Sequence, residues 1–274
     1  MCTFVASADI AAGQALDGRL KQISDTKVVR LAYRADSNPF SFLDRQGEPV
    51  GYTIDLCKLV VASLERQLDS KLEVKWVAVT SQNRFEAIAN GAADMECGSS
   101  TVTLGRMKEV DFSSFIFVEN TGVMVKAASR ILRLSDLKGK TIAVISGTTN
   151  ERAVARELQR RQIDANLLRV ESRAEGMAAL EEGNADGLAS DKLLLSVTQI
   201  GAPVILLPED LSVEPYAIVL PRGDWAFRLA VNTALAETYR SNKILEIYAA
   251  WFSGVGPRPN VLIGAVYMLG ALPD

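Results

Sequence analysis

The chain has 274 residues, of which 48% are hydrophobic and 23% are charged, and its net charge at pH 7 is −3. This composition is typical of a soluble globular protein with one large or two medium cores, and it offers no basic excess for binding nucleic acid or an anionic membrane. Histidine is absent, which excludes a Ser-His-Asp triad and most zinc sites, so we expect no metal and no cofactor. The apolar run at 261–272 has about 12 residues, whereas a membrane span needs about 20.

Residues 1–27 are expected to form an N-terminal arm. Within it, Ala6-Ser7-Ala8 fits the A-x-A pattern of a signal-peptidase site, which predicts an exported protein whose signal peptide is largely missing here; a disordered start is the alternative. The three cysteines, Cys2, Cys57 and Cys97, show no C-x-x-C spacing. They allow at most one disulfide, and the sequence does not choose the pair.

Strands and helices alternate over the first hundred residues. Apolar runs at 28–33 and 72–79 predict strands, and 54–68 carries apolar residues at helical spacing. Residues 40–43 and 50–52 flank a polar turn and predict a hairpin. This alternation predicts a parallel sheet with helices on its faces, where ligands bind at the carboxyl ends of the strands.

The stretch 95–106 carries the strongest local signal for a binding site. It turns on Gly98, continues through four hydroxyl residues in five positions, and ends on Arg106, which we expect within the first turns of a helix. Backbone N–H groups, short hydroxyls and a guanidinium at a helix start would together form a cradle for a carboxylate. The ordinary alternative is a capped helix with a surface arginine.

The second half of the chain repeats this plan. Strands are predicted at 141–145, 167–170 and 186–189, and helices at 150–162, 175–182 and 192–200. The segment Ala87-Ile88-x-x-Gly91-x-Ala93-Asp94 recurs as Ala179-Leu180-x-x-Gly183-x-Ala185-Asp186. Each copy predicts a helix that ends on a glycine and turns into a strand, which supports two similar α/β lobes.

Two extended segments, 117–126 and 215–220, are the candidates for strands that cross between the lobes. We therefore expect lobe 1 to comprise 28–118 plus 219–274, and lobe 2 to comprise 119–218. Helices at 225–241 and 244–252 would return to lobe 1. Pro257-Arg258-Pro259 is expected to begin an irregular tail.

Polar side chains follow the predicted strands in both lobes. They are Arg34, Ser81, Arg84, Ser99, Thr101 and Arg106 in lobe 1, and Thr148, Thr149, Arg173 and Asp191 in lobe 2. The set holds four positive groups and one negative group. One arginine and one aspartate can neutralise the carboxylate and ammonium of a free amino acid, and the remaining arginines suit a second carboxylate.

Each of these residues also has an ordinary structural explanation. The arginines could be solvated, and Arg84 could pair with Glu86 or Asp94 on its own helix. Thr149 and Asp191 could simply cap helices. The shared location at the strand ends favours a binding site over these alternatives.

Several segments resemble the type II periplasmic solute-binding proteins of ABC importers, in the polar amino-acid branch and especially its glutamate- and aspartate-binding members. The similarity runs over most of 28–252 and is carried by Tyr33-Arg34-x4-Pro39-Phe40-Ser41, Gly51-Tyr52, Thr80-Ser81-Gln82-Asn83-Arg84, Glu96-Cys97-Gly98-Ser99-x-Thr101, Phe112-Ser113-x-x-Ile116-Phe117-Val118, Asp136-Leu137-Lys138-Gly139-Lys140 and Ser146-Gly147-Thr148-Thr149. The resemblance implies an α/β fold of two lobes, each a mostly parallel sheet with flanking helices, joined by two crossing strands. It also implies a monomer that passes an acidic amino acid to a membrane ABC permease.

The resemblance further implies how the amino-acid backbone of a ligand is held. Arg106 and Thr101, with Thr149 from the other lobe, are similar to ligands of the α-carboxylate. Ser99 and Asp191 are similar to partners of the α-ammonium.

For the side-chain carboxylate, the resemblance implies Arg34, Ser81 and Arg84. Arg173 stands where the family pattern has a histidine, which adds a permanent positive charge but could also shorten the pocket. The preference between glutamate and aspartate is therefore open.

Two other function classes compete with this interpretation. Dehydratases for prephenate- or arogenate-like dicarboxylates share the fold and also need arginines. Such an enzyme would need an acid in the cleft, for which Glu96 and Glu119 are the candidates. A ligand-sensing domain of a larger receptor is the third class, and a transmembrane helix encoded further along the gene would indicate it. We expect a binding protein and not an enzyme.

Overall fold

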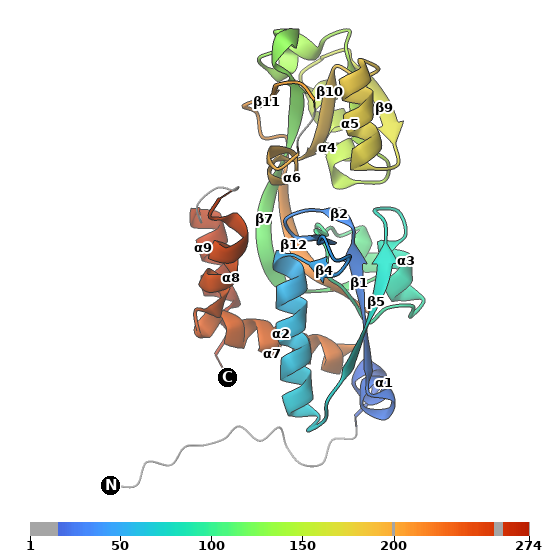
Figure 1. Cartoon of the computed structure of the whole chain (residues 1–274), viewed down its shortest axis with the longest axis vertical. Helices are drawn as coiled ribbons and strands as arrows, with labels where there is room; N and C mark the ends of the chain where they lie inside the picture. Colours follow the sequence, from blue (N-terminus) through green and yellow to red (C-terminus); the bar gives the residue numbers. More distant parts are fainter. Residues whose placement is uncertain (1–15, 199–200, 255–259, 274) are drawn as a thin grey trace, which may run out of the picture.

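The computed structural model describes residues 16–198, 201–254 and 260–273. Two groups of elements are stacked along the long axis of the molecule and joined by the strands β7 (Asp111–Lys126) and β12 (Val213–Leu220) (Figure 1). Both strands were expected as crossing segments. β7 is longer than predicted because it begins inside lobe 1 and ends inside lobe 2.

Lobe 1, the lower group in Figure 1, is built on three parallel strands and the adjoining part of β7 and β12. Its strands are β1 (Val28–Arg34), β5 (Glu73–Val79) and β6 (Met95–Glu96), and a small antiparallel sheet contains β2 (Asp36–Ser37), β3 (Ser41–Leu43) and β4 (Pro49–Val50). Its helices are α1 (Gly18–Thr26), α2 (Tyr52–Gln67), α3 (Arg84–Ala89), α7 (Trp225–Arg240), α8 (Lys243–Phe252) and α9 (Val261–Gly270). The expected hairpin is the pair β3–β4.

Lobe 2, the upper group, has the parallel strands β8 (Thr141–Ile145), β9 (Asn166–Val170) and β10 (Gly187–Asp191). β11 (Val204–Leu206) and β10 pair antiparallel with β7. The other elements are α4 (Thr149–Arg160), α5 (Arg173–Glu182) and α6 (Lys192–Ser196), with the 3₁₀ turns η2 (Ala127–Ser129) and η3 (Leu134–Leu137).

One continuous strand order, β5-β1-β6-β12-β7-β10-β8-β9, passes through both lobes. Its centre is the antiparallel pair β12–β7. On one side of this pair, β6, β1 and β5 are parallel to one another, and on the other side, β10, β8 and β9 are parallel to one another. The carboxyl ends of β1, β6, β8 and β10 therefore face the junction between the lobes. This is the edge at which an open α/β sheet binds its ligands.

The hydrophobic core is divided into clusters that lie mainly within one lobe each, although the cluster of lobe 1 also includes Leu193 and Leu194 of α6. The lobe 1 core is centred on an aromatic cluster of Phe40, Tyr52, Phe117, Tyr216 and Phe252. The lobe 2 core is aliphatic and contains Val123, Val125, Ile142, Val144, Val154 and Leu158. The residue boundaries expected for the lobes, 118/119 and 218/219, stay a prediction.

The predicted repeat forms the same local structure in both lobes. Gly91 and Gly183 both have positive φ, at 79° and 85°, which glycine adopts without steric cost. The carboxylate of Asp94 then accepts from the backbone N–H of Arg30 at 2.7 Å, as that of Asp186 accepts from Thr141 at 2.9 Å. Each aspartate thus ties its turn to the start of the neighbouring strand.

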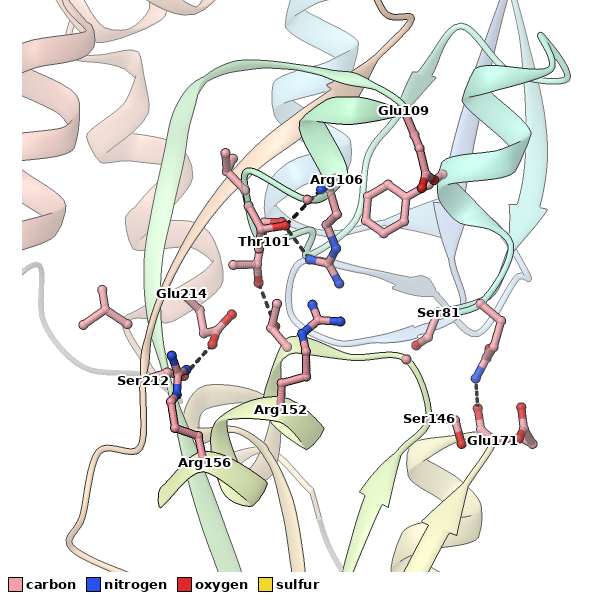
Figure 2. A pocket seen from close by; sticks show the side chains of 18 residues that line it. Ser81, Thr101, Arg106, Glu109, Ser146, Arg152, Arg156, Glu171, Ser212 and Glu214 are labelled. Carbon is pink, nitrogen blue, oxygen red and sulfur yellow. Dashed lines mark hydrogen bonds between the residues drawn. The ribbon is translucent and has the colours of Figure 1, made fainter. Parts of the chain in front are cut away.

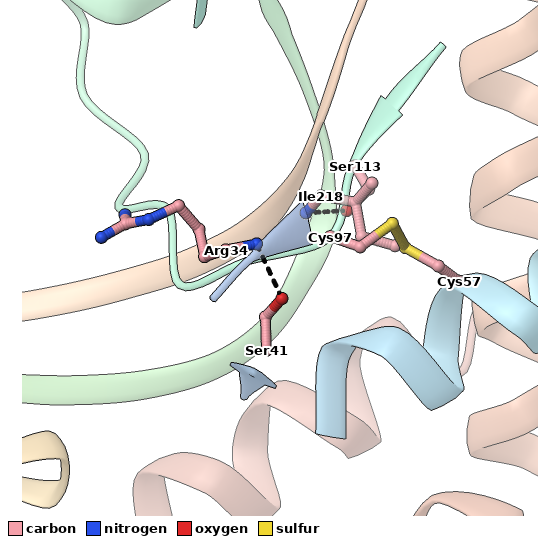
Figure 3. The surroundings of a disulfide bond; sticks show 6 residues. All are labelled: Arg34, Ser41, Cys57, Cys97, Ser113 and Ile218. Atoms are coloured by element: carbon pink, nitrogen blue, oxygen red, sulfur yellow. Dashed lines mark hydrogen bonds between the residues drawn. A yellow bond between two sulfur atoms is a disulfide. The ribbon is translucent and has the colours of Figure 1, made fainter. Parts of the chain in front are cut away.

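A disulfide joins Cys57 on α2 to Cys97, which directly follows β6, with Cα atoms 6.2 Å apart. This resolves the pairing that the sequence left open, and Cys2 lies outside the described residues. Figure 3 shows the bridge to the right of Arg34, whose backbone N–H donates to Ser41 Oγ at 2.9 Å. The bridge fixes α2 against the segment that carries Ser99.

The expected irregular tail is wrong for 261–270, which forms α9. The side chain of Asn260 accepts from the backbone N–H of Ile263 at 2.9 Å and starts the helix. Ile263 and Tyr267 are buried, and the Tyr267 hydroxyl lies 2.9 Å from that of Tyr52, so tertiary packing orders the segment. Residues 257–259 and the A-x-A segment lie outside the described residues. In the described part of the chain, every helix is too short or too polar to cross a membrane.

Candidate functional site

Two adjoining spaces lie between the lobes. We call the first the inner cavity, and its lining is polar except for one isoleucine: Arg34, Ser81, Arg84, Ser99, Thr101, Ile145, Thr148, Thr149, Asn150, Arg173, Ser190 and Asp191. The second, the outer groove, is shown in Figure 2 and includes Arg106, Glu109, Arg152, Arg156 and Glu171. Ser81, Thr101 and Thr149 line both. The structure therefore brings eight of the nine expected site residues to the inner cavity and places Arg106 beside it.

The lobes touch across this site. The hydroxyls of Thr101 and Thr149 lie 3.3 Å apart, and Gln82 Nε2 donates to the carbonyl of Glu171 at 3.0 Å. The inner cavity has a volume of about 20 Å³, against about 1110 Å³ for the outer groove. A space of this size holds about one water, so an amino acid can enter only when the lobes or the lining side chains move apart.

Arg84 is buried at the start of α3 without the partners expected for a structural arginine. Its alternative partner Asp94 instead pairs with Arg19 at 3.1 Å and Arg30 at 2.6 Å. The guanidinium of Arg84 lies 4.7 Å from the ring centre of Phe85, and Nε is buried with no hydrogen-bond partner among the described residues. Burial, followed by repulsion from other arginines, lowers the pKa of Arg84 to about 9. The carboxylates of Glu96 and Asp191 act against this shift, but Arg84 forms no direct ion pair with a carboxylate among the described residues, so a ligand carboxylate could supply one.

Arg106 does not begin the expected α-helix. It begins a single 3₁₀ turn, η1 (Arg106–Lys108), so the helix dipole proposed for the cradle is missing. Its Nη1 donates to the carbonyl of Thr101 at 2.7 Å, and its Nη2 is buried without a partner among the described residues. Burial and the charge of Arg152 lower the pKa of Arg106 to about 10. The guanidinium stands at the border between cavity and groove, beside the hydroxyl of Thr101.

Lobe 2 contributes hydroxyls and a carboxylate from the starts of two helices. Thr148, and not Thr149, caps α4 by accepting from the backbone N–H of Glu151 at 3.2 Å, which leaves the Thr149 hydroxyl facing Thr101. Asp191 precedes α6 but makes no side-chain cap, so the simple capping alternative is wrong. Its carboxylate accepts from Asn150 Nδ2 at 3.1 Å.

Asp191 also lies in a cluster of buried carboxylates at the crossing strands. Burial and the nearby charge of Glu214 raise its pKa. Glu119 and Glu214 stand directly opposite each other on β7 and β12, and burial together with Asp191 raises the pKa of Glu119 to about 8. An ammonium group beside Asp191 would relieve this accumulation of negative charge.

Arg173 is the first residue of α5 and reaches across to lobe 1. Its Nη1 donates to the backbone carbonyl of Asp36, and its buried Nε has no partner among the described residues. The carboxylate of Asp36 holds Arg34, with Nε–Oδ1 at 2.9 Å and Nη2–Oδ2 at 3.0 Å. Burial alone would raise the pKa of Asp36, but the guanidinium groups of Arg34 and Arg173 outweigh this effect and lower it.

The sequence reasoning missed several residues that belong to this region. Asn150 and Ser190 line the cavity next to the expected Thr149 and Asp191, and their position in the chain was the available signal. Asp36 was missed because only folding brings it to Arg173. Asp36 pairs directly with Arg34 and so adds a second negative charge beside the four expected arginines.

The chain is similar over most of its length to known solute-binding proteins. A family model described as bacterial extracellular solute-binding proteins, family 3, matches residues 29–254. The chain is 35% identical over 256 residues to the L-glutamate/L-aspartate-binding protein of Pseudomonas aeruginosa, covering 90% of this chain and 83% of that protein. It is 31% identical over 258 residues to the glutamate/aspartate import solute-binding protein of Salmonella typhimurium, covering 92% and 83%. Other matched proteins are named for glutamine or histidine.

A solved structure of a mutant of ArgBP from T. maritima is similar to this fold with a TM-score of 0.76 and 25% identity, and it covers 85% of this chain and 99% of that chain. The two-lobed fold of type II periplasmic binding proteins, expected from the sequence, is thereby confirmed. Because the family match extends over most of the chain, the protein belongs to the bacterial extracellular solute-binding proteins of family 3.

Proposed function

We propose that the protein binds an acidic amino acid, glutamate or aspartate, between its lobes and delivers it to an ABC permease outside the cytoplasm, in the periplasm. The observation that carries this proposal is the set of buried guanidinium donors that have no partner in the described part of the chain, namely Nε of Arg84, Nε of Arg173 and Nη2 of Arg106. Leaving such donors unpaired is costly, and a ligand with two carboxylates would satisfy them. The two relatives named for glutamate and aspartate support the same ligand class.

The position of each group suggests one orientation for the ligand. The α-carboxylate would bind Arg106, Thr101 and Thr149 at the border with the outer groove. The α-ammonium would bind Asp191 and Ser99.

The side-chain carboxylate would then point into the inner cavity toward Arg84, Arg173 and Ser81, with Arg34 beside them. Closure of the lobes around the ligand excludes water and strengthens these charge-assisted contacts. The permease would recognise the closed form of the monomer.

We further propose that the protein is not an enzyme. Both candidate acids, Glu96 and Glu119, are buried, and neither is among the residues lining the cavity or the groove. A dehydratase would need an acid that acts on the substrate, and the one acid among the residues lining the inner cavity, Asp191, is the partner proposed for the ligand's ammonium. Incubating the purified protein with prephenate or arogenate should give no product; steady turnover would favour the dehydratase alternative.

A thermal-shift screen with matched ligands tests the binding proposal. For a dissociation constant of about 1 µM, ligand at 1 mM adds about 4 kcal/mol to the stability of the folded protein. Glutamate or aspartate should therefore raise the melting temperature by several degrees. Glutamine lacks one negative charge and glutarate lacks the ammonium, so both should give smaller shifts. Equal shifts with all four compounds, or none with any of them, would contradict the proposal.

A further inference from the structure

Asp36 lies next to the inner cavity, outside its lining, and contacts one arginine from each lobe. Its carboxylate takes the Nε and Nη2 donors of Arg34 in a two-bond fork, and its carbonyl accepts from Nη1 of Arg173. Asp36 itself does not line the cavity, although both arginines do. It therefore acts on a bound ligand only through the guanidinium groups.

Arg34 lies near the other arginines of the cavity, so its net charge matters to all of them. After burial, the charge of Arg34 is a cause of the lowered pKa of both Arg84 and Arg173. Arg34 and Arg173 are 3% and 8% exposed, so water screens their charges weakly. The carboxylate of Asp36, which is hydrogen-bonded to Arg34, therefore reduces the positive electrostatic potential around the arginines of the inner cavity.

We propose that Asp36 determines the charge selectivity of the inner cavity, by offsetting one guanidinium and so allowing neutral amide side chains to bind alongside acidic ones. This inference rests on the proposed function. It assigns a role to a residue that makes no ligand contact, and it gives the ligand class as acidic amino acids together with their amides.

The Asp36→Asn variant tests the proposal because it removes the charge and keeps the shape and one acceptor for Arg34. We measure the dissociation constants of L-glutamate and L-glutamine by calorimetry in the parent and the variant. The ratio of the glutamine constant to the glutamate constant should rise about 3- to 10-fold, a modest effect because the Asp36 side chain is 36% exposed. Asp164→Asn, the same change at an exposed site of lobe 2, should leave the ratio unchanged.

Salt separates a charge effect from a merely structural one. In 0.5 M NaCl the difference between the Asp36→Asn variant and the parent should shrink, because screening weakens the interaction of charges. If Asp36 only positions Arg34, the variant loses affinity for glutamate and the ratio falls. A ratio that falls, or that changes less than twofold, overturns the proposal.

The remaining outcomes are also decisive. Asp36→Ser, which removes the charge with a smaller side chain, should shift the ratio in the same direction, so the test does not depend on one variant folding. If the parent binds neither glutamate nor glutamine, the proposed function is wrong and the role of Asp36 is wrong with it. If the parent binds glutamate and both variants keep its ratio, only the role of Asp36 is wrong.

Discussion

Replacing Arg84 with methionine should stabilise the ligand-free protein and, at the same time, weaken its binding of glutamate. Arg84 is 4% exposed, and its pKa is lowered to about 9 because burial and neighbouring arginines disfavour the charged form. At about 1.4 kcal/mol per pKa unit, the charge costs the folded protein up to about 5 kcal/mol at neutral pH. Since the pKa of Arg84 in the folded protein lies below its value in the unfolded chain, this cost is fully present below about pH 9 and is lost as the pH rises above that value.

Methionine keeps an unbranched side chain beside Phe85 but carries no charge. Because Glu96 loses the favourable charge of Arg84, the net increase in the free energy of unfolding should be about 2–3 kcal/mol. This raises the melting temperature by about 4–10 °C. The glutamate dissociation constant should increase about 10- to 100-fold, because a charge-assisted hydrogen bond contributes about 1.5–3 kcal/mol. Glutamine affinity should change much less.

Scanning calorimetry without ligand and titration calorimetry with both ligands measure the two effects. Arg45→Met is the matched control, since Arg45 is exposed in the β3–β4 turn, and neither quantity should change in it. If Arg84→Met is no more stable than the parent and binds glutamate equally well, then the buried charge of Arg84 neither destabilises the ligand-free protein nor binds the side-chain carboxylate of the ligand.

Three further changes probe other parts of the account. Arg106→Met should weaken glutamate and glutamine binding by similar factors in titration calorimetry, because both share the α-carboxylate; a loss confined to glutamate would contradict this role. Glu119 has its pKa raised from 4.5 to about 8 by burial and Asp191, so its contribution to stability is lost as pH rises across that range. In denaturant titrations, the free energy of unfolding of Glu119→Gln should therefore match that of the parent near pH 5 and exceed it at pH 9 by up to about 5 kcal/mol. If the pH dependence of stability is the same in the variant and the parent, the raised pKa of Glu119 is wrong. Reducing the Cys57–Cys97 bridge, whose cysteines are 40 positions apart, should cost about 4 kcal/mol and lower the melting temperature, whereas a double alanine variant should not respond to the reductant.

Local patterns were sufficient to predict most of the fold. The apolar run at 141–145 has the bounds of β8, because a strand buried between two others needs a continuous apolar sequence. The repeated glycine turns were also predicted correctly, since a positive φ at Gly91 and Gly183 is a local requirement. The strand ends then carried most of the cavity residues to one edge of the sheet.

Features that depend on distant contacts could not be predicted in this way. Asp36 and Arg173 are 137 positions apart, and no spacing in the sequence indicates that they meet. The helix α9 follows a proline-rich segment that predicts irregular chain, and burial of Ile263 and Tyr267 against lobe 1 overrides that signal. Arg106 was predicted on an α-helix that the chain does not form, whereas Thr101, five residues earlier, lines the inner cavity.

The central claim is that arginines from two lobes enclose one small amino acid with two negative ends. Its most direct test is calorimetric titration of the purified protein with L-glutamate and with L-aspartate. The account predicts one site per chain and a dissociation constant in the micromolar range or tighter for at least one of them, about −8 kcal/mol or more favourable. Absence of saturable binding of either ligand at millimolar concentration would contradict it.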